Sequence, residues 1–232
     1  MKIGIIGAMD YEITLLVEAM ATETKRTVAG SLYHQGQLHG VDVVAVVSGI
    51  GKVNAALCAQ ILISEFEVTH VINTGVSGAV KDFLEVGDTV ISTDLVEHDF
   101  DVTGFGGYKF GEIPRMETST FVADEHLRAL ALEAAKAVVT QYKVYEGRIV
   151  SGDQFVASPE KKDFLLETFN ATTTEMEGAA IGHVCYVNNK PFVIIRAMSD
   201  KADGSAHVNF ETFSREAAIN AAQIVMRMLE AL

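Results

Sequence analysis

Six short apolar runs rich in valine and isoleucine recur along this chain, and Ala-rich segments of helical length lie between several of them. The runs are KIGIIGAM, VDVVAVVSG, HVINTGV, GDTVISTDL, GRIVSGDQF and PFVIIRAMSD. Continuous apolar runs of this length are typical of strands buried on both faces of a sheet. The segments KVNAALCAQILISEF and EMEGAAIGHVCYVNN predict helices that cover such a sheet. We therefore expect an α/β fold with a mixed, mostly parallel central sheet flanked by helices.

The whole chain, residues 1–232, is expected to form a single domain. It is 49% hydrophobic and 21% charged, a composition that supports a substantial core. No linker rich in Pro, Gly or Ser, no low-complexity stretch and no repeat of fixed period interrupts the pattern of apolar runs. Residues 211–232 place apolar side chains at helical spacing, which predicts a C-terminal helix packed on the sheet.

The charge and the apolar segments exclude several classes of partner. The formal net charge is −13, and Lys and Arg form no cluster, so a nucleic acid would be repelled. The first residues resemble neither a signal peptide nor a transit sequence, and no apolar stretch has the length of a membrane span. Cys58 and Cys185 lie in apolar runs, where packing is their expected role. We expect a cytoplasmic protein that binds neither nucleic acid nor membrane.

A ligand site is expected at the carboxyl ends of the predicted strands, because loops and helix N-termini converge there in α/β sheets. Glycines, small hydroxyls and carboxylates dominate the residues at those ends, which are 9–12, 48–51, 74–78, 151–155 and 199–200. Residues 4–7 read G-x-x-G rather than the dinucleotide fingerprint, and residues 49–52 lack two of the residues of a P-loop. The glycines are therefore interpreted as tight turns, and no cofactor is expected.

Three carboxylates at these positions carry the candidate chemistry, and each also has a structural explanation. Thr174 and Glu177 match a helix capping box, but Glu177 facing a cleft could accept both hydroxyls of a ribose. Asp200 ends an apolar strand, where desolvation would keep it protonated near neutral pH, but Asp is also a good N-cap. Glu12 is ambiguous in the same way, since acidic residues are favoured in the first turn of a helix.

Metal and covalent chemistry are not expected. Residues 97–101, EHDFD, resemble a metal cluster, but no second group of ligands at suitable spacing supports one. A solvated or subunit-facing loop is the expectation for this segment. The seven histidines are scattered, and neither a Ser/His/Asp order nor a nucleophile elbow is present. The carboxylates are therefore expected to act without a metal or a covalent nucleophile.

Several motifs occur together in order from residue 1 to the C-terminal helix. They are MKIGIIGAM with Glu12, SGIGKVNAA, INTGVSGAV, HDFDVTGFG, IVSGDQF, TTTEMEGAA and IIRAMSD. In these motifs the chain resembles the 5′-methylthioadenosine/S-adenosylhomocysteine nucleosidases, whose superfamily also includes purine and uridine phosphorylases and futalosine nucleosidases. The resemblance implies hydrolysis of the N-glycosidic bond of 5′-methylthioadenosine, S-adenosylhomocysteine and also 5′-deoxyadenosine, with release of adenine and the thioribose.

The resemblance also implies a role for each matching residue. Asp200 is the expected acid at purine N7, Glu12 the residue that orients or deprotonates water, and Glu177 the carboxylate that holds the ribose hydroxyls. The remaining substrate-binding residues are expected to be Met176 beneath the sugar, Arg196 near the water, Phe155 and Val156 around adenine, Val76 and Ser199 near the acid, and Met9, Ile50, Val102 and Phe210 around the 5′-thioalkyl group. Family members are homodimers, so Phe105, Ile113 and Pro114 are expected to reach the partner's site.

The chain departs from the family pattern at Asp10 and Tyr11 and at Val76 and Ser77, and Val76 lies near the expected acid. Alternatives to the nucleosidase are a phosphate-dependent purine nucleoside phosphorylase, an aminodeoxyfutalosine nucleosidase and a catalytically silent nucleoside-binding protein. Against the phosphorylase, Asp10 and Glu12 would repel phosphate, and the chain has only seven arginines. Water is therefore the expected nucleophile.

Overall fold

The structure is a computed structural model that describes residues 1–232 with the exception of the Thr22 side chain. One sheet of ten strands forms its centre. The strands are β1 (Lys2–Gly7), β2 (Ala21–Val28), β3 (Ser31–Leu38), β4 (Val41–Val47), β5 (His70–Ala79), β6 (Thr89–Glu97), β7 (Phe121–Val122), β8 (Val144–Ser151), β9 (Thr173–Glu175) and β10 (Phe192–Asp200). The helices are α1 (Asp10–Glu18), α2 (Lys52–Ser64), the 3₁₀ turn η1 (Thr103–Phe105), α3 (Glu125–Val138), α4 (Pro159–Phe169), α5 (Gly178–Val187) and α6 (Ala206–Leu229).

The six predicted strands are all present, as β1, β4, β5, β6, β8 and β10, and the expected α/β class is confirmed. Among these six, β1 pairs in parallel with β4 and β5, β5 with β10, and β6 with β8, whereas β10 and β6 are antiparallel. The strand order is β10-β6-β8-β9-β5-β1-β4-β3-β2, and an additional pairing of β10 with β5 closes the first five strands into a ring.

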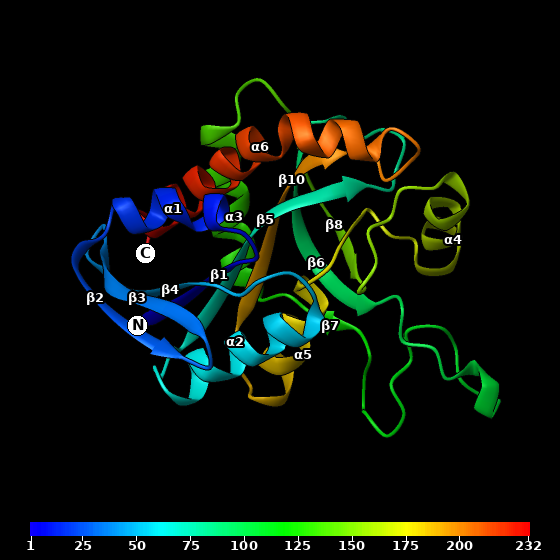
Figure 1. Cartoon of the computed structure of the whole chain (residues 1–232), viewed down its shortest axis with the longest axis horizontal. Coiled ribbons are helices and arrows are strands. Elements are labelled where there is room, and N and C mark those ends of the chain that lie inside the picture. Colours follow the sequence, from blue (N-terminus) through cyan, green and yellow to red (C-terminus); the bar gives the residue numbers. More distant parts are fainter.

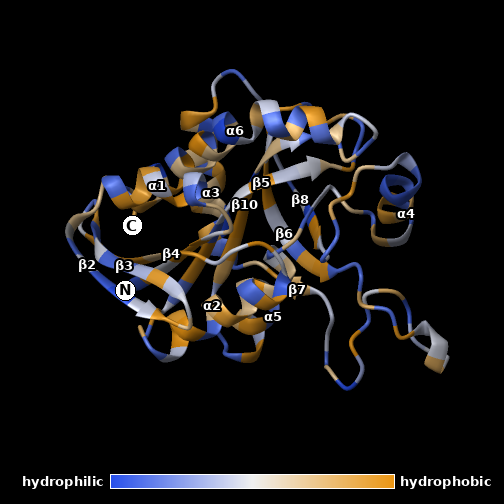
Figure 2. Ribbon diagram, viewed as in Figure 1, coloured by the Kyte–Doolittle hydropathy of each residue, from blue (hydrophilic) through white to orange (hydrophobic). Residues whose placement is uncertain are grey.

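Helices cover both faces of this sheet, which explains why the strands are apolar without alternation. In Figure 1, α1, α3 and α6 lie on one side of the central strands, and α2 and α5 lie on the other. On β10, Ile194 belongs to the hydrophobic cluster beneath α2 and α5, whereas its neighbour Ile195 belongs to the cluster beneath α3 and α6. Figure 2 accordingly shows hydrophobic colours along β10. Both faces of such a strand are buried, so both sets of side chains are apolar.

Two parts of the fold do not follow from the apolar runs. β2 and β3 form an antiparallel hairpin that extends the sheet beyond β4, and the sequence of β2, ATETKRTV, is mostly polar. Residues 98–120, which we call the arm, connect β6 to β7 and extend away from the sheet (Figure 1). None of the described helices is long and apolar enough to cross a membrane.

The core position Ile72 provides a test of this packing. Ile72 lies on β5 and is fully buried, so Ile72→Ala is expected to lower the free energy of unfolding by about 2–5 kcal/mol through lost apolar contact and a residual cavity. Val208 on α6 is 70% exposed, so Val208→Ala should change it by less than about 0.5 kcal/mol. Urea unfolding measures both values, and equal losses would contradict the assignment of the core.

Candidate active site

A cavity of about 470 Å³ opens where β1, β5, β8 and β10 end, as the strand-end rule predicts. Eleven of the residues that line it were predicted as site residues from the sequence: Met9, Glu12, Ile50, Val76, Phe155, Val156, Met176, Glu177, Ser199, Asp200 and Phe210. Ser77, Gly78 and Gln154 also line the cavity and fall within the predicted strand-end segments. The lining residues not predicted as site residues are Ala8, Thr174, Glu175, His207 and Glu211.

Glu12 both stabilises the start of α1 and faces the cavity. Its Oε2 accepts hydrogen bonds from the backbone N–H groups of Ala8 (2.7 Å) and Met9 (3.0 Å), and its Oε1 accepts one from Val76 (3.1 Å). Burial raises the pKa of this carboxyl, although Arg196 and the three backbone donors oppose the increase. A Cβ on Gly75 would lie 2.5 Å from Glu12 Oε1, so glycine is required beside the carboxylate.

Asp200 is the last residue of β10, and each of its carboxyl oxygens has a hydrogen-bond donor. Oδ1 accepts from the backbone of Ala202 at 2.8 Å, and Oδ2 accepts from Ser199 Oγ at 2.9 Å. Burial raises its pKa, as the sequence analysis expected. The interpretation of Asp200 as a helix cap is wrong, because α6 begins six residues later and its N-cap is Ser205.

Val76 does not orient Asp200, whose hydrogen bonds come from Ser199 and Ala202. The Val76 side chain packs against alanines of α6, and its backbone N–H holds Glu12. Instead, Gly78 pairs with Asp200 across β5 and β10, and a Cβ there would lie 2.7 Å from Asp200 Oδ1. The departure from the family pattern at position 76 therefore affects the packing of α6 and leaves the hydrogen bonds of Asp200 unchanged.

Glu177 is the N-cap residue of α5, but its side chain makes no capping hydrogen bond, so the predicted capping box is wrong. Thr174 lies in β9, and α5 begins only at Gly178. Glu175 Oε2 accepts from the backbone N–H groups of Glu177 (3.0 Å) and Gly178 (2.8 Å). The Glu177 carboxylate instead accepts a hydrogen bond from the backbone of Gly51 at 2.8 Å and faces the cavity. Glu177 is therefore available for a ligand.

Arg196 lies beneath the cavity, not in its wall. It is buried, and its Nη2 lies 2.5 Å from Glu175 Oε2, 2.6 Å from Asn73 Oδ1 and 3.8 Å from Glu177 Oε2. Although burial disfavours the charged form, Arg196 and Ser151 hold the pKa of Glu175 below its usual value. Burial and the adjacent Glu175 raise the pKa of Glu177 to about 8. Arg196 therefore supports the carboxylates from beneath.

Aromatic side chains form the outer part of the cavity. The Phe155 ring lies 5.3 Å from the ring of His207 and 5.8 Å, edge to face, from that of Phe210. His207, Phe210 and Glu211 reach the cavity because α6 begins at Ala206, five residues before the predicted start of the C-terminal helix. Helical spacing, with 207 and 211 one turn apart, was the signal that could have identified His207 and Glu211.

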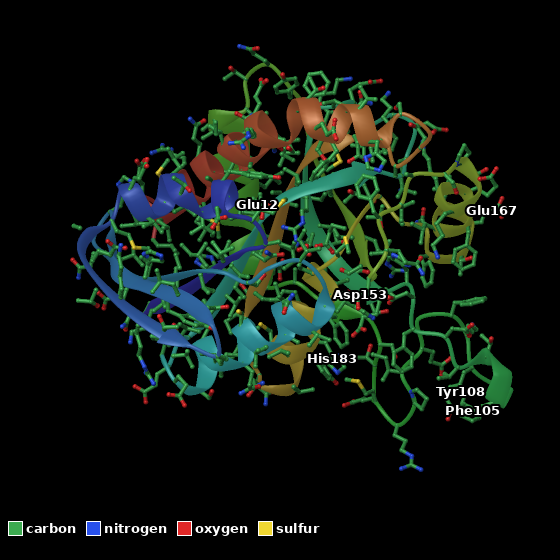
Figure 3. All side chains as sticks on the ribbon, in the orientation of Figure 1. Glu12, Phe105, Tyr108, Asp153, Glu167 and His183 are labelled. Atoms are coloured by element: carbon green, nitrogen blue, oxygen red, sulfur yellow. The ribbon has the colours of Figure 1, made fainter. Side chains whose placement is uncertain are left out.

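The arm residues are separated from this cavity within one chain. Val102 and Phe105 do not line it, and Phe105 is 82% exposed. Figure 3 shows Phe105 and Tyr108 at the far end of the arm, remote from Glu12. Ile113 and Pro114 lie nearer the root of the arm and are half-buried, with Ile113 packed against the core cluster of α2 and α5.

The segment 97–101 is not a solvated loop over most of its length. Glu97 and His98 are buried, and Lys52 forms ion pairs with Glu97 (2.9 Å) and Asp99 (2.6 Å). Neither ring nitrogen of His98 has a hydrogen-bond partner, and burial lowers its pKa to about 4, so the ring is neutral. In the described part of the chain, no group of three or more His, Cys, Asp or Glu side chains is arranged to hold a metal.

The geometry supports acid and base chemistry on a neutral or positively charged ligand. Two carboxyl groups with raised pKa values, Glu12 and Asp200, face one cavity, and Glu177 adds a third. No Lys or Arg side chain lines the cavity, as far as the structure describes it. An inorganic anion would therefore meet carboxylates without a compensating cation.

The comparisons with known proteins all point to one family. A model of the phosphorylase superfamily matches residues 2–230. A 5′-methylthioadenosine/S-adenosylhomocysteine nucleosidase of Anoxybacillus flavithermus is 44% identical over 100% of this chain and 99% of its own. The crystal structure of the Neisseria meningitidis nucleosidase with methylthio-immucillin-A has a TM-score of 0.95 at 40% identity, covering 100% and 99% of the two chains. A futalosine hydrolase of Helicobacter pylori has a TM-score of 0.94 at 35% identity, covering 100% and 98%.

The raised pKa of Glu177 predicts how stability depends on pH. The folded value of about 8 lies above that of an exposed glutamate, about 4.3, so folding retains a proton that the unfolded chain releases between these values. Stability from this group is present below pH 4.3 and is lost as pH rises toward 8. Glu177→Gln is expected to increase the free energy of unfolding at pH 8 and to flatten its decline between pH 5 and 8, measured by urea unfolding.

Glu167→Gln is the matched control, because Glu167 is exposed on α4 (Figure 3). This substitution should leave the pH dependence as it is in the parent protein. Glu12 and Asp200 also have raised pKa values, so part of the decline should remain in Glu177→Gln. An unchanged decline in Glu177→Gln would show that Glu177 is ionised in the folded protein.

Proposed function

Since the chain belongs to the phosphorylase superfamily and, within it, to the 5′-methylthioadenosine/S-adenosylhomocysteine nucleosidases, we propose that it hydrolyses the N-glycosidic bond of these two nucleosides. The products are adenine and the corresponding thioribose. The observation that carries the proposal is the pair of buried carboxyl groups, Asp200 and Glu12, facing one cavity with Glu177 beside them.

Asp200 is proposed as the acid that protonates the leaving base. Cleavage of the bond between ribose C1′ and adenine N9 builds negative charge on adenine, so a proton delivered to N7 stabilises the transition state. Burial raises the pKa of Asp200 and favours its protonated form near neutral pH. The bonds from Ser199 and Ala202 support this role because they fix the orientation of the carboxyl group.

Glu12 and Glu177 are proposed to act on the sugar side. Positive charge develops on the ribose as the bond breaks, and nearby carboxylates stabilise it. Glu12 would orient and deprotonate the attacking water, and its three backbone donors support a fixed position for that task. Although burial raises the pKa of Glu177, Arg196 beneath it favours the ionised form, in which its two oxygens would accept the two ribose hydroxyls.

The remaining cavity residues are proposed to bind the two ends of the nucleoside. Phe155 would stack on adenine and the backbone of Val156 would hydrogen-bond it, with Ser199 and Val76 near the acid. Met176 would lie beneath the sugar, and Met9, Ile50 and Phe210 would surround the 5′-thioalkyl group. The mixture of apolar walls and few polar groups in this cavity supports a nucleoside ligand.

We also propose that the chain is one cytoplasmic domain that works as a homodimer, in which the arm closes the partner's cavity. Ile50, Val53 and Leu57 form an exposed apolar stripe at the start of α2, which a monomer would leave in water. Phe105 is exposed on the arm. The partner contribution would come from Val102, Phe105, Ile113 and Pro114. Cys58 and Cys185 are both free and buried, which suits a reducing compartment.

The proposed reaction predicts phosphate-independent turnover. Incubation with 5′-methylthioadenosine in phosphate-free buffer should release adenine and free methylthioribose, resolved by liquid chromatography. Asp200→Asn should lower kcat by about 10²–10⁴-fold because the general acid is lost, with nucleoside binding retained. Asp203→Asn, three residues along, is the control and should keep parental activity. S-adenosylhomocysteine, 5′-deoxyadenosine and aminodeoxyfutalosine are assayed in parallel.

Each alternative has its own result in that assay. Strict dependence on phosphate with a ribose 1-phosphate product would identify a phosphorylase. Turnover of aminodeoxyfutalosine without turnover of the thioadenosines would identify a futalosine-type nucleosidase. Binding without turnover of any nucleoside would identify a silent binding protein.

The homodimer predicts that a charge on the apolar stripe separates the subunits. Val53 is 78% exposed in one chain, so Val53→Asp should cost a monomer little, whereas in a dimer it would bury an unpaired carboxylate. Sedimentation velocity should show a dimer for the parent and a monomer for Val53→Asp, with reduced activity. Val208→Asp, on the exposed part of α6, should remain dimeric. A monomeric parent would disprove the proposal.

A further inference from the structure

Lys52, the first residue of α2, connects two carboxylates that the proposed reaction does not use. Its Nζ lies 2.9 Å from Glu97 Oε2 and 2.6 Å from Asp99 Oδ1. Glu97 ends β6, and Asp99 is the second residue of the arm. Although burial opposes the charged form, both carboxylates hold the pKa of Lys52 above its usual value. The half-buried ammonium group therefore remains charged and fixed between two anions.

A second set of bonds connects the same helix start to the segment after β8. The Lys52 backbone N–H donates to Asp153 Oδ1 at 2.8 Å, and the Asp153 N–H donates to Asp99 Oδ2 at 2.8 Å. Lys52, Asp99 and Asp153 thus form a closed ring of polar contacts. Gly51 fits against this ring only as glycine, because its φ is +97° and a Cβ would lie 2.9 Å from Asp153 Oδ1.

The neighbours of this ring in sequence are residues of the active site. Gly51, next to Lys52, donates its N–H to Glu177 Oε1 at 2.8 Å. Within the described residues this is the one hydrogen bond that the Glu177 carboxylate accepts. Asp153, which Figure 3 labels beside the start of α2, is followed by Gln154, Phe155 and Val156 of the cavity wall. The ring therefore lies behind both the ribose and the adenine regions of the proposed site.

We propose that Lys52 is a positioning residue that sets the distance between the ribose carboxylate Glu177 and the adenine-binding segment. The inference rests on the proposed nucleosidase function. With the ammonium in place, the first turn of α2 is tied to β6 and to Asp153, so the Gly51 N–H points at Glu177. Without it, the buried Glu97 and the half-buried Asp99 repel each other, the first turn of α2 shifts, and Glu177 loses its donor.

The test compares two substrates, 5′-methylthioadenosine and its 2′-deoxy analogue. The parent should prefer the ribonucleoside because Glu177 accepts its 2′-hydroxyl. In Lys52→Met, kcat/KM for the ribonucleoside should fall about 10–100-fold, as displaced positioning groups typically produce, and the preference over the deoxy analogue should decrease about tenfold. Lys52→Arg, whose guanidinium can bridge both carboxylates, should restore most of both quantities.

Two further variants separate positioning from folding. Asp153→Ala removes the acceptor for the Lys52 N–H from an exposed position and should decrease the same preference in a fully folded protein. Lys162 lies on α4, is about as buried as Lys52, and pairs with Asp82 at 2.9 Å. Lys162→Met should leave both kinetic quantities unchanged. Thermal unfolding is measured for every variant.

The outcomes distinguish this inference from the proposed function. A lower melting temperature with unchanged substrate preference in Lys52→Met and Asp153→Ala would overturn the positioning role. The affinities for both nucleosides are also measured by calorimetry in the Asp200→Asn background. A parent without turnover would disprove the proposed function, and the ratio of the two affinities would still show whether Lys52 positions Glu177. An equal ratio with and without Lys52 would overturn the inference.

Discussion

The ion pair between Arg196 and Glu175 is the contact on which the rest of the site depends. Burying two charges is costly, and further hydrogen bonds to both groups offset part of that cost. Here Glu175 also accepts from Ser151 and from the backbone at the start of α5, and Arg196 also contacts Asn73. The pair therefore joins β10, β9, β5 and α5 at one point. Because the Glu175 side chain accepts the N–H groups at the start of α5, the Glu177 side chain is left to face the cavity.

The same pair divides the carboxylates into groups with different proton affinities. One buried guanidinium lies near three glutamates, and the closest, Glu175, stays ionised. Burial then raises the pKa of Glu12 and of Glu177, both farther from the cation. Asp200 has no cation among the groups that lower its pKa, so burial dominates there too. The proposed N-glycosidic cleavage needs an acid at the base and carboxylates near the sugar, and Asp200, Glu12 and Glu177 all face the same cavity.

Particular residues show how far sequence reasoning extends. The apolar runs identified the central strands because two-sided burial excludes polar side chains from both faces of a strand. Glu12 and Asp200 were found because they follow such strands. The capping interpretation of Glu177 was wrong because residues 173–175 pair with β5 and β8, which delays the helix until Gly178. The β2–β3 hairpin was missed because its edge strand is solvated, so its sequence has no continuous apolar run.

The sequence alone determined the α/β class, the position of the site at the strand ends and the three candidate carboxylates, because these depend on local composition and on the order of elements. Tertiary structure decided the tasks of the charged residues. The deciding contacts join residues that are distant in sequence, some of them more than a hundred positions apart. They are the contacts between Arg196 and Glu175, between Gly51 and Glu177, and among Lys52, Asp99 and Asp153. Burial and partners set the pKa of a side chain, and neither is encoded by its neighbours in sequence.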